Sequence, residues 1–450
     1  MMRVVLAIAA ALAVATSAAG QTEAPAIDRP VPARLTLQEA LARAIETSHI
    51  LAELRAREGA ASAVLDQQKA SDMPALSAQA GYRRTNHVEE FGVPQPNPPR
   101  IEIIYPDVPD NWRTRLDLAW PIYTGGRTGA LEHAADAERL ASGKDLESAR
   151  ADLVLETTRA FWALVTATES VRVVGESITR IEAQHSDVKA RLDAGFLPPN
   201  DVLTVATRVS QERTLLLDAQ NQRDSARAVL ARLIGARVDV EFEPEATLAE
   251  GALPVPASAQ ILDLTAEARG ARADRQALLF RVQGADARID AARSGNHPWI
   301  SIAAGYDYAR PNPVIFPRQD AWKTSWDAGV NVSWTLWNGG RTAAEVAEAK
   351  QQAAATRERL AEFDSQVALE IRQRQLDLAT ALAQVKTAGE AVGTAVEARR
   401  VVQERVTAGV ATTTDLLDAQ QDQLEAELQR TRALASVKLA EARLARALGQ

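Results

Sequence analysis

Four segments of the chain alternate apolar and polar residues with a period of two. They cover residues 76–83, 115–122, 300–308 and 327–336, and the first reads LSAQAGYR. This periodicity predicts β-strands that each have one apolar face. Each run is about ten residues long, which is the length of a tilted strand that crosses a membrane. The loops between paired strands, 84–114 and 310–325, are rich in proline.

Two long segments without proline follow the second and fourth strands and predict helices. Arg127–Ala194 and Arg341–Ala408 each contain 68 residues rich in Ala, Leu, Glu and Arg, or about 100 Å of helix. Each segment is followed by a glycine, Gly195 or Gly409, as helix C-termini prefer. Four helices of about 35 residues are expected over 37–71, 200–234, 261–294 and 414–448. Two of these placed end to end match one long helix, and the last carries a coiled-coil seam that includes Leu417, Leu424 and Leu428.

The elements recur because the chain contains an internal duplication. GGRT at 125–128 matches GGRT at 339–342 at an offset of 214 residues. Nearer the start of each half the offset is 224, as between Gly81-Tyr82 and Gly305-Tyr306. We therefore predict the following division: a signal peptide over 1–20, a first repeat over 21–235, a connector over 236–259 and a second repeat over 260–450.

Glycine pairs join strands to long helices in both repeats. Gly125 and Gly126 follow the second strand, and Gly339 and Gly340 follow the fourth. Because glycine has no Cβ, each pair lets the backbone leave strand geometry and enter a helix without a side-chain clash. The pattern predicts a wall of strands that continues directly into a wall of helices.

Aromatic residues gather at the strands. Seven of the eight Trp and all five Tyr lie in or beside them. Aromatic side chains at strand ends are typical of the lipid-contacting girdle of a membrane barrel, and the candidates are Trp120, Tyr123, Trp334 and Trp337. The alternative is a soluble sheet whose apolar face packs on a core, although the rest of the sequence offers no second sheet.

The number of strands has a consequence for assembly. Four strands are too few to close a barrel, and the edges of an open sheet would leave backbone groups unpaired in hydrocarbon. Several copies would therefore share one barrel. Two copies give eight strands and a lumen filled by side chains, whereas three give twelve strands and leave room for a channel lined by the polar faces.

Composition and charge narrow the class of function. The net charge of −8 argues against a nucleic-acid-binding protein. Arg3, a short apolar run and small residues near Ala18 predict a signal peptide and export. The chain has no cysteine, which excludes disulfides and a lipid-modified N-terminal cysteine. No catalytic constellation, nucleotide-binding motif or paired histidines stand out, so we expect no enzymatic activity, no cofactor and no metal site.

Together these motifs resemble the TolC-like outer-membrane efflux protein family. The resemblance rests on PIYTGGR (121–127), TLWNGGR (335–341), AGFLPPNDVL (194–203), AGVATTTDLLDAQ (408–420) and the duplication. It implies a mostly α-helical homotrimer, in which a twelve-stranded β-barrel in the outer membrane of a Gram-negative bacterium continues into a periplasmic α-helical barrel. It also implies passive exit, in efflux or type I secretion, for substrates delivered by an inner-membrane transporter of the RND or ABC type and a periplasmic adaptor protein. Drugs, metals, peptides and proteins stay open as substrates.

The resemblance also implies an aperture at the periplasmic turns of the helices. Its candidate residues are Asp415, Asp418 and Asp422, which the helical spacing puts on one face. A ring of such carboxylates would attract cations, and crowding of like charges would raise some of their pKa values. The simpler interpretation is helix capping, with Thr414 as a candidate cap.

Contacts with the adaptor are implied around the same turns, at Gly195, Asp201, Arg405 and Gly409. For Asp201 we favour a capping role, with Asn200 as a further candidate cap. The positions of the family's latch residues hold Val406 and Ala411 here, so Arg405 is the candidate for a different latch.

The competing hypothesis is a soluble periplasmic coiled-coil adaptor. Adaptors carry a compact β-barrel or lipoyl-like module and usually an inner-membrane anchor, and the sequence shows neither. The apolar strand faces favour the channel over the adaptor.

Overall fold

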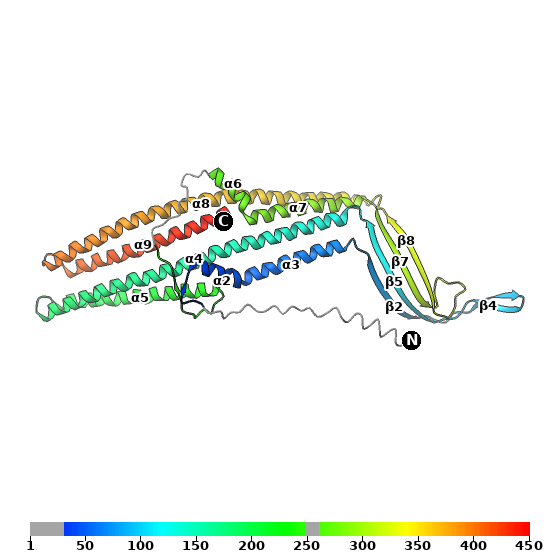
Figure 1. The fold of residues 1–450 in the computed structure, drawn as a ribbon, viewed down its shortest axis with the longest axis horizontal. Coiled ribbons are helices and arrows are strands. Elements are labelled where there is room, and N and C mark those ends of the chain that lie inside the picture. The colour runs from blue at the N-terminus through cyan, green and yellow to red at the C-terminus, as the bar shows by residue number, and fades with distance from the viewer. Residues whose placement is uncertain (1–30, 249–260) are drawn as a thin grey trace. The chain divides into compact units, whose positions relative to one another are not determined.

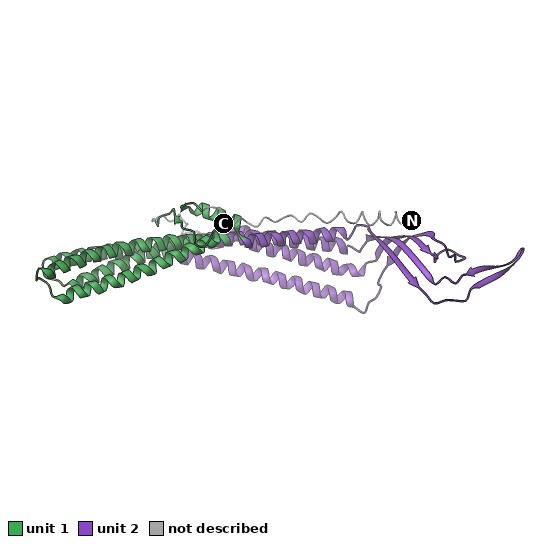
Figure 2. Ribbon diagram, turned by 90° about the horizontal axis from the view of Figure 1, so that it is seen from below, with its two compact units in different colours: residues 1–48, 153–255, 378–442 green, residues 49–152, 256–377, 443–450 purple. Residues whose placement is uncertain are grey.

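The computed structural model describes residues 31–248 and 261–450 (Figure 1). These residues form two compact units, shown in different colours in Figure 2. The helical unit contains residues 31–48, 153–248 and 378–442, and the sheet unit contains residues 49–152, 261–377 and 443–450. The predicted signal peptide lies outside the described residues.

The sheet unit is built on a four-stranded antiparallel sheet in the order β2-β5-β7-β8. The strands are β2 (Ala75–Arg84), β5 (Asp110–Tyr123), β7 (Trp299–Arg310) and β8 (Lys323–Ser333). The four predicted strands are confirmed, except that β8 ends before Trp334 and Leu336. The central pair, β5 and β7, joins the last strand of the first repeat to the first strand of the second.

The strand register gathers the apolar residues on one face of this sheet. Leu76 lies opposite Leu118, Leu116 lies opposite Tyr306, and Ile302 lies opposite Val330. Leu118 and Ile302 are half-buried, but the other four side chains are exposed, with Leu76 at 71% and Val330 at 64%. The sheet therefore presents an open apolar face, as the period of two predicts.

A separate two-stranded hairpin lies in the loop between β2 and β5, and the sequence analysis did not predict it. Its strands are β3 (Phe91–Pro96) and β4 (Pro99–Tyr105). Because this segment contains prolines in and between its strands, the sequence analysis treated it as a loop. Both strands of an isolated hairpin are edge strands, where proline is tolerated because its missing N–H can face solvent.

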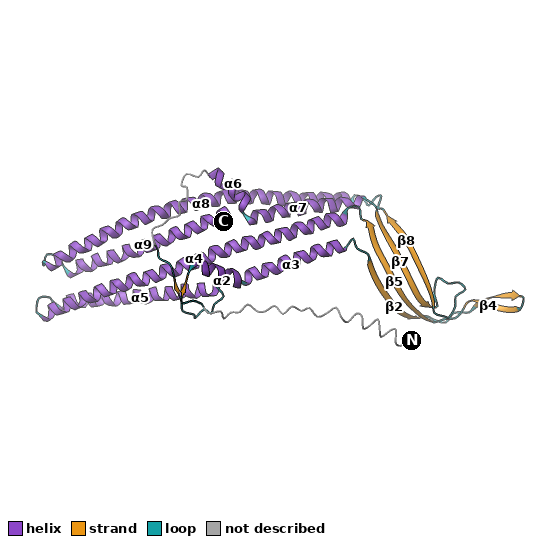
Figure 3. Cartoon of the chain, viewed as in Figure 1, coloured by secondary structure: helices purple, strands orange, loops and turns teal. Residues whose placement is uncertain are grey.

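Helices make up most of the remaining chain (Figure 3). The two long ones, α4 (Arg127–Asp193) and α8 (Arg341–Thr407), each have 67 residues and confirm the prediction. The return helices are α5 (Pro199–Leu233) and α9 (Thr413–Leu448). The other elements are α2 (Leu37–Thr47), α3 (His49–Ala70), α6 (Ile261–Ala271), α7 (Ala273–Arg293), the 3-10 turn η1 (Ser294–Asn296), and the parallel pair β1 (Arg34–Leu35) and β6 (Glu243–Pro244). Among the described residues, no helix is both long and apolar enough to cross a membrane.

The two helices predicted ahead of the strands, over 37–71 and 261–294, are each broken in two, which corrects the single helix expected in each place. The breaks fall at Ser48 and Arg272, where the backbone is extended (φ/ψ −66°/117° and −66°/118°). These positions are 224 residues apart, so the break recurs at the offset of the duplication. No proline lies at either site, and Gly270, two residues before the second break, lies within α6 and has no counterpart at the first.

The end of each return helix lies against one of these breaks. A Cβ added to Gly235, after α5, would lie 2.5 Å from Thr47 Cβ in the helical unit. A Cβ added to Gly449, after α9, would lie 2.9 Å from the backbone N of Arg272 in the sheet unit. Both glycines have positive φ, +67° and +86°. Tertiary packing of two helix ends therefore explains breaks that local propensity does not.

An ion network holds the second break. Arg272 is buried, and its guanidinium donates to Asp274 (2.8 Å), Glu370 (2.7 Å) and the carbonyl oxygen of Ala447 (3.3 Å). Burial alone would raise the pKa of Asp274, but the hydrogen bond and charge of Arg272, with the charge of Arg446, hold that pKa below its ordinary value. A buried pair of this kind is costly to break, because one charge would be left without its partner.

The variant Gly235→Ala tests whether the end of α5 packs against the break between α2 and α3. The variant combines a left-handed backbone, which costs an L-residue about 1–2 kcal/mol, with a clash against Thr47. We expect the free energy of unfolding of the helical unit to fall by about 2 kcal/mol or more, measured by denaturant titration of the helical circular dichroism signal. The control is Gly175→Ala within α4, where nothing lies within 4 Å of the new Cβ; it should stabilise by up to about 1 kcal/mol. Equal effects in the two variants would contradict the packing argument.

Candidate functional site

The strand-to-helix junctions have the geometry that the glycine pairs predict. Gly125 and Gly126 have φ of +65° and +84°, and Gly339 and Gly340 have +69° and +86°. All four therefore lie in the left-handed region that disfavours residues with a Cβ. Just before the second pair, Asn338 Nδ2 donates to Thr342 Oγ1, in the first turn of α8, at 2.7 Å. The predicted direct passage from strand to helix is confirmed for the first repeat, where only residues 124–126 separate β5 from α4, whereas residues 334–340 separate β8 from α8.

The predicted girdle tryptophans also fasten the helix ends to the sheet. The indole N–H of Trp120 donates to the carbonyl oxygen of Asp72 at 3.0 Å, and that of Trp334 donates to Asn296 at 3.1 Å. The two bonds are equivalent under the duplication, and the rings stay largely exposed. Tyr123 is also exposed, as is Trp337, at 86%. An amphipathic ring with a satisfied N–H and an uncovered apolar body suits a membrane interface.

A second group of aromatic rings lies at the opposite ends of the strands. Tyr82 contacts Trp112 with ring centroids 4.5 Å apart, and Tyr308 stacks on Trp322 at 4.8 Å. On β5, Trp112 and Trp120 are eight residues apart, or about 26 Å along a strand. That separation is close to the roughly 25 Å apolar band of membrane barrels. The aromatic residues therefore bracket a band of membrane dimensions.

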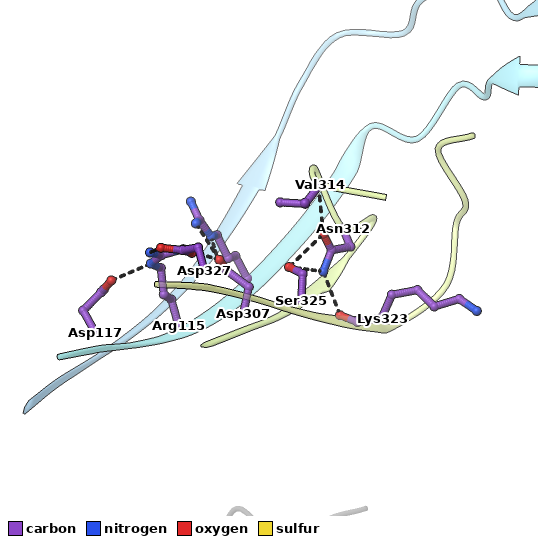
Figure 4. A network of polar contacts seen from close by, with 9 residues as sticks. Arg115, Asp117, Asp307, Asn312, Val314, Lys323, Ser325 and Asp327 are labelled. Atoms are coloured by element: carbon purple, nitrogen blue, oxygen red, sulfur yellow. Dashed lines mark hydrogen bonds and ion pairs between the residues drawn. The ribbon is translucent and has the colours of Figure 1, made fainter. Parts of the chain in front are cut away.

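The polar face of the sheet carries a network of charges (Figure 4). Asp307 on β7 is 1% exposed and accepts hydrogen bonds from Arg113 Nε (2.5 Å) and from Arg115. Arg115 also pairs with Asp117 (2.5 Å) and, across β7, with Asp327 on β8 (2.9 Å). The network ties three strands together on the face opposite the apolar one.

A glycine makes room for this network. A Cβ at Gly305 would lie 2.1 Å from Arg115 Nη2, so the guanidinium can cross β7 only because that position has no side chain. Further along the same face, buried Asn312 donates to the carbonyl oxygen of Lys323 (3.1 Å) and to Ser325 Oγ (3.0 Å). The loop after β7 is therefore fixed to β8, as Figure 4 shows. The sequence analysis found the polar alternation but missed the charge network, which depends on strand register.

In the helical unit, both helix turns begin with the same motif. Gly195 and Gly409 follow α4 and α8 with φ of +80° and +76°. After each, the next residue donates to a carbonyl oxygen five residues back: Phe196 to Arg191 (2.8 Å) and Val410 to Arg405 (2.9 Å). This is the Schellman arrangement of a helix C-terminus. The helix ends predicted from the two glycines are confirmed, and both turns expose an apolar side chain.

The acidic residues on α9 form an exposed stripe. Asp415, Asp418 and Asp422 are exposed, whereas Leu416, Leu417 and Leu424 of the same helix are buried. Within one chain Asp415 also has a local role. Its Oδ2 accepts hydrogen bonds from the backbone N and Oγ1 of Thr412, both at 2.8 Å, and Thr412 Oγ1 accepts from the Asp415 backbone N (3.1 Å). Thr412 is therefore the cap of α9, and the candidate cap Thr414 was wrong.

The pKa of Asp415 is lowered in the single chain, in the direction opposite to the rise expected for a crowded ring. The backbone hydrogen bond from Thr412 is the main cause, followed by the Thr412 hydroxyl, and the charge of Arg405 adds a smaller part. Arg405 is exposed and its charge acts on Asp415 across the turn. Arg405 and Asp415 form no ion pair among the described residues, so a latch role for Arg405 stays a prediction.

The first-repeat turn lacks such a cap, which corrects the interpretation favoured for Asp201. Helix α5 has Pro198 at its N-cap position with no side-chain hydrogen bond. Asn200 and Asp201 lie inside the helix, and the Asp201 backbone N donates to the carbonyl oxygen of Pro198 (3.2 Å). The helix begins at Pro199, where the fixed φ of proline replaces a polar cap.

A polar layer is buried between two apolar clusters of the helical unit. One cluster contains Ile181, Val188, Val205, Val209 and Leu417, and the other contains Val173, Val174, Ile178 and Leu424. On α5, Glu212 lies between Val209 of the first cluster and Leu216, which packs against the second. Glu212 is 3% exposed, and neither carboxylate oxygen forms a hydrogen bond of good geometry. Burial raises its pKa, against the weaker opposing effects of Ser177, Arg208 and Arg180. No pattern in the sequence marks Glu212 as buried, because its burial depends on which faces of α4, α5 and α9 meet.

Within residues 31–248 and 261–450, no group of three or more His, Asp or Glu side chains is placed to hold a metal ion.

Comparison with known proteins identifies the class. The model of the outer membrane efflux protein family matches residues 40–236 and 264–450, most of the chain and both copies of the duplication. The chain therefore belongs to the outer membrane efflux protein family, as the motifs indicated.

Individual relatives agree with this class. Protein CyaE of Bordetella pertussis is 26% identical over 307 residues, which span 65% of this chain and 60% of CyaE. Two solved structures share the fold. The outer membrane protein VceC of Vibrio cholerae has a TM-score of 0.76 at 20% identity, over 92% of this chain and 96% of VceC. The MtrE outer membrane channel of Neisseria gonorrhoeae has a TM-score of 0.73 at 17% identity, over 94% and 93% of the two chains.

Glu212→Gln tests the buried carboxyl and its pH dependence. The folded-state pKa of Glu212 is raised above the ordinary value of 4.5, so the folded protein favours the protonated carboxyl. The contribution of this preference to the free energy of unfolding is fully present below the ordinary pKa and is lost as the pH rises through the folded-state pKa. The neutral variant should be more stable than wild type at pH 7, by about 1–3 kcal/mol, and the difference should shrink as pH falls toward about 4. Denaturant unfolding of the helical signal at several pH values measures this.

The matched control is Glu182→Gln on α4, an exposed glutamate that pairs with Arg213. It should change stability by less than about 0.5 kcal/mol at any of these pH values. A Glu212→Gln variant that is less stable than wild type at pH 7 would contradict the assignment.

Proposed function

We propose that the protein is a homotrimeric outer-membrane channel that gives passive exit to substrates crossing the periplasm. The observation that carries the proposal is the sheet itself. Its apolar face is exposed, and its outer strands, β2 and β8, have no partner on their outer sides among the described residues. In hydrocarbon, edge groups without hydrogen bonds are not tolerated, so the edges must be paired by further copies. Three copies give twelve strands and a lumen wide enough to conduct.

Family membership and the shared fold support this function. A Gram-negative outer membrane is the proposed location, with the sheet in lipid and the helices in the periplasm. The proposed partners are a periplasmic adaptor and an inner-membrane transporter of the RND or ABC type, in efflux or type I secretion. The helix turns around Gly195 and Gly409 are the proposed adaptor contacts, because they expose apolar side chains such as Phe196 and Val410 at a helix end. A non-enzymatic role follows from the same family membership.

The exposed stripe of Asp415, Asp418 and Asp422 is the proposed selectivity element at the periplasmic end. Three copies would bring nine carboxylates around one opening, and a ring of carboxylates favours cations. The cap between Thr412 and Asp415 supports this role, because it fixes the first turn of α9 on which the stripe begins.

Val330→Arg tests whether the apolar face meets lipid. Arginine on the lipid face near the middle of a membrane barrel costs about 2–4 kcal/mol per copy, so we expect loss of trimers from the outer-membrane fraction. Native mass spectrometry of the detergent extract measures the trimer. The control is Asn331→Arg, the next residue on the polar face of β8, which should still assemble. Normal trimers of Val330→Arg would count against the channel and favour a soluble adaptor.

The double variant Asp415→Asn, Asp418→Asn tests the aperture. Asparagine keeps an acceptor for the Thr412 cap while it removes the charge. In single-channel recordings, block by divalent cations added on the periplasmic side should weaken about tenfold, because the carboxylates that attract the cations are gone. Asp201→Asn, at the equivalent position of the first repeat, is the control and should leave block unchanged. Unchanged block in the double variant would remove the aperture from these residues and leave the channel intact.

A further inference from the structure

The two repeats obey one register rule. Adding 224 to residue numbers on β2 and 214 to those on β5 converts the β2–β5 pairs into the β7–β8 pairs. Ala75 opposite Ala119 becomes Trp299 opposite Ser333, and Tyr82 opposite Trp112 becomes Tyr306 opposite Trp326. All four of these residue pairs are observed. The offsets read from the sequence are therefore also offsets of hydrogen-bond register.

The same rule specifies how a second copy would pair with the free edges. Within the chain, β5 ends the first repeat and pairs with β7, which begins the second. Under the duplication β8 corresponds to β5, and β2 corresponds to β7. The β5–β7 pair of Leu116 with Tyr306 therefore converts to Val330 with Tyr82, and the pair of Ala119 with Ala303 converts to Ser333 with Gln79. The contact between copies would repeat the contact between repeats.

Charges on the polar face agree with this register. The β5–β7 pair of Arg115 with Asp307 converts to Gly329 opposite Arg83. Arg83 has no ion pair or side-chain hydrogen bond within the described part of its own chain. Nothing lies within 4 Å of a Cβ placed at Gly329, and the side chain of its polar-face neighbour Asp327 is 61% exposed. Diagonal neighbours two residues along a facing strand are about 7–8 Å apart, within reach of an arginine.

We propose that β8 of one copy pairs antiparallel with β2 of the next in this register, and that Arg83 of one copy pairs with Asp327 of the other. The occupant of the free edges is thus a second copy of this chain. The inference rests on the proposed trimeric channel and adds the residues that close it. The charge network of Arg113, Asp307, Arg115 and Asp327 then continues across each junction between copies, along the inside of the barrel.

Disulfide cross-linking tests the register, since the chain has no native cysteine. Gln79→Cys with Ser333→Cys places the two thiols directly opposite each other, within disulfide reach. Strands β5 and β7 separate β2 from β8 within one chain, so any cross-link joins two copies. Oxidation of the membrane-embedded protein should give covalent trimers on a denaturing gel. Gln79→Cys with Asn331→Cys, displaced by two residues on the same face, is the control and should cross-link at least fivefold less.

The outcomes separate the register from the channel. Trimers by native mass spectrometry that cross-link preferentially through the displaced pair would overturn the register and leave the proposed function standing. Wild-type protein that forms no trimer would overturn the proposed function, and the register with it.

A double-mutant cycle tests the ion pair. Arg83→Gln should lower the temperature at which the trimer dissociates by several degrees in wild type, and should have no further effect in an Asp327→Asn background. Arg84→Gln, the neighbouring arginine on the opposite face, should show no such dependence on Asp327. Additive effects of Arg83→Gln and Asp327→Asn would overturn the ion pair.

Discussion

The hydrogen-bonding demand of strand edges in lipid is the constraint on which the rest of this structure depends. Water can satisfy the free N–H and C=O groups of an edge strand in a soluble protein, but hydrocarbon cannot. The chain leaves both the edges and the apolar face of its sheet open. In a soluble fold, one element would have to pair with the strand edges and another would have to cover the apolar face. In a closed ring of copies within a membrane, neighbouring strands pair with the edges and lipid covers the apolar face. The duplication makes closure simple, because each edge already resembles a strand that is paired inside the chain.

Glycines at positive φ solve a second problem, which is how the chain enters a long helix from the segment that follows a strand and how it leaves that helix again. Gly125 and Gly339 turn the strands into helices, and Gly195 and Gly409 end those helices in Schellman turns. No other residue type adopts this backbone at so little cost. These positions set the direction of the backbone locally and do not depend on packing between distant residues. They are therefore the positions that are easiest to identify from the sequence.

The sequence predicted elements with strong periodicity and failed where long-range packing decides. The four strands and both 67-residue helices follow from alternation, proline-free length and glycine. The breaks at Ser48 and Arg272 do not, because they arise where Gly235 and Gly449 meet helices distant in sequence. The β3–β4 hairpin was hidden by its prolines. At the turn before α9, Thr412 rather than Thr414 proved to be the cap, since the helix begins one residue earlier than predicted, and the aperture role of the acidic residues stays a prediction.

Differences between the repeats indicate where the second half has specialised. The turn before α9 carries a reciprocal cap between Thr412 and Asp415, whereas the turn before α5 relies on proline. The break at Arg272 is tied by buried ion pairs, while the equivalent position in the first repeat is the short, uncharged Ser48. A capped first turn keeps Asp415 and Asp418 at fixed positions on α9, which the proposed electrostatic filter requires because Coulomb energies change steeply with distance. Both turns expose an apolar side chain, Phe196 in the first repeat and Val410 in the second, so the repeats differ at the turn in the capping of the acidic residues and not in their suitability for the proposed adaptor contact.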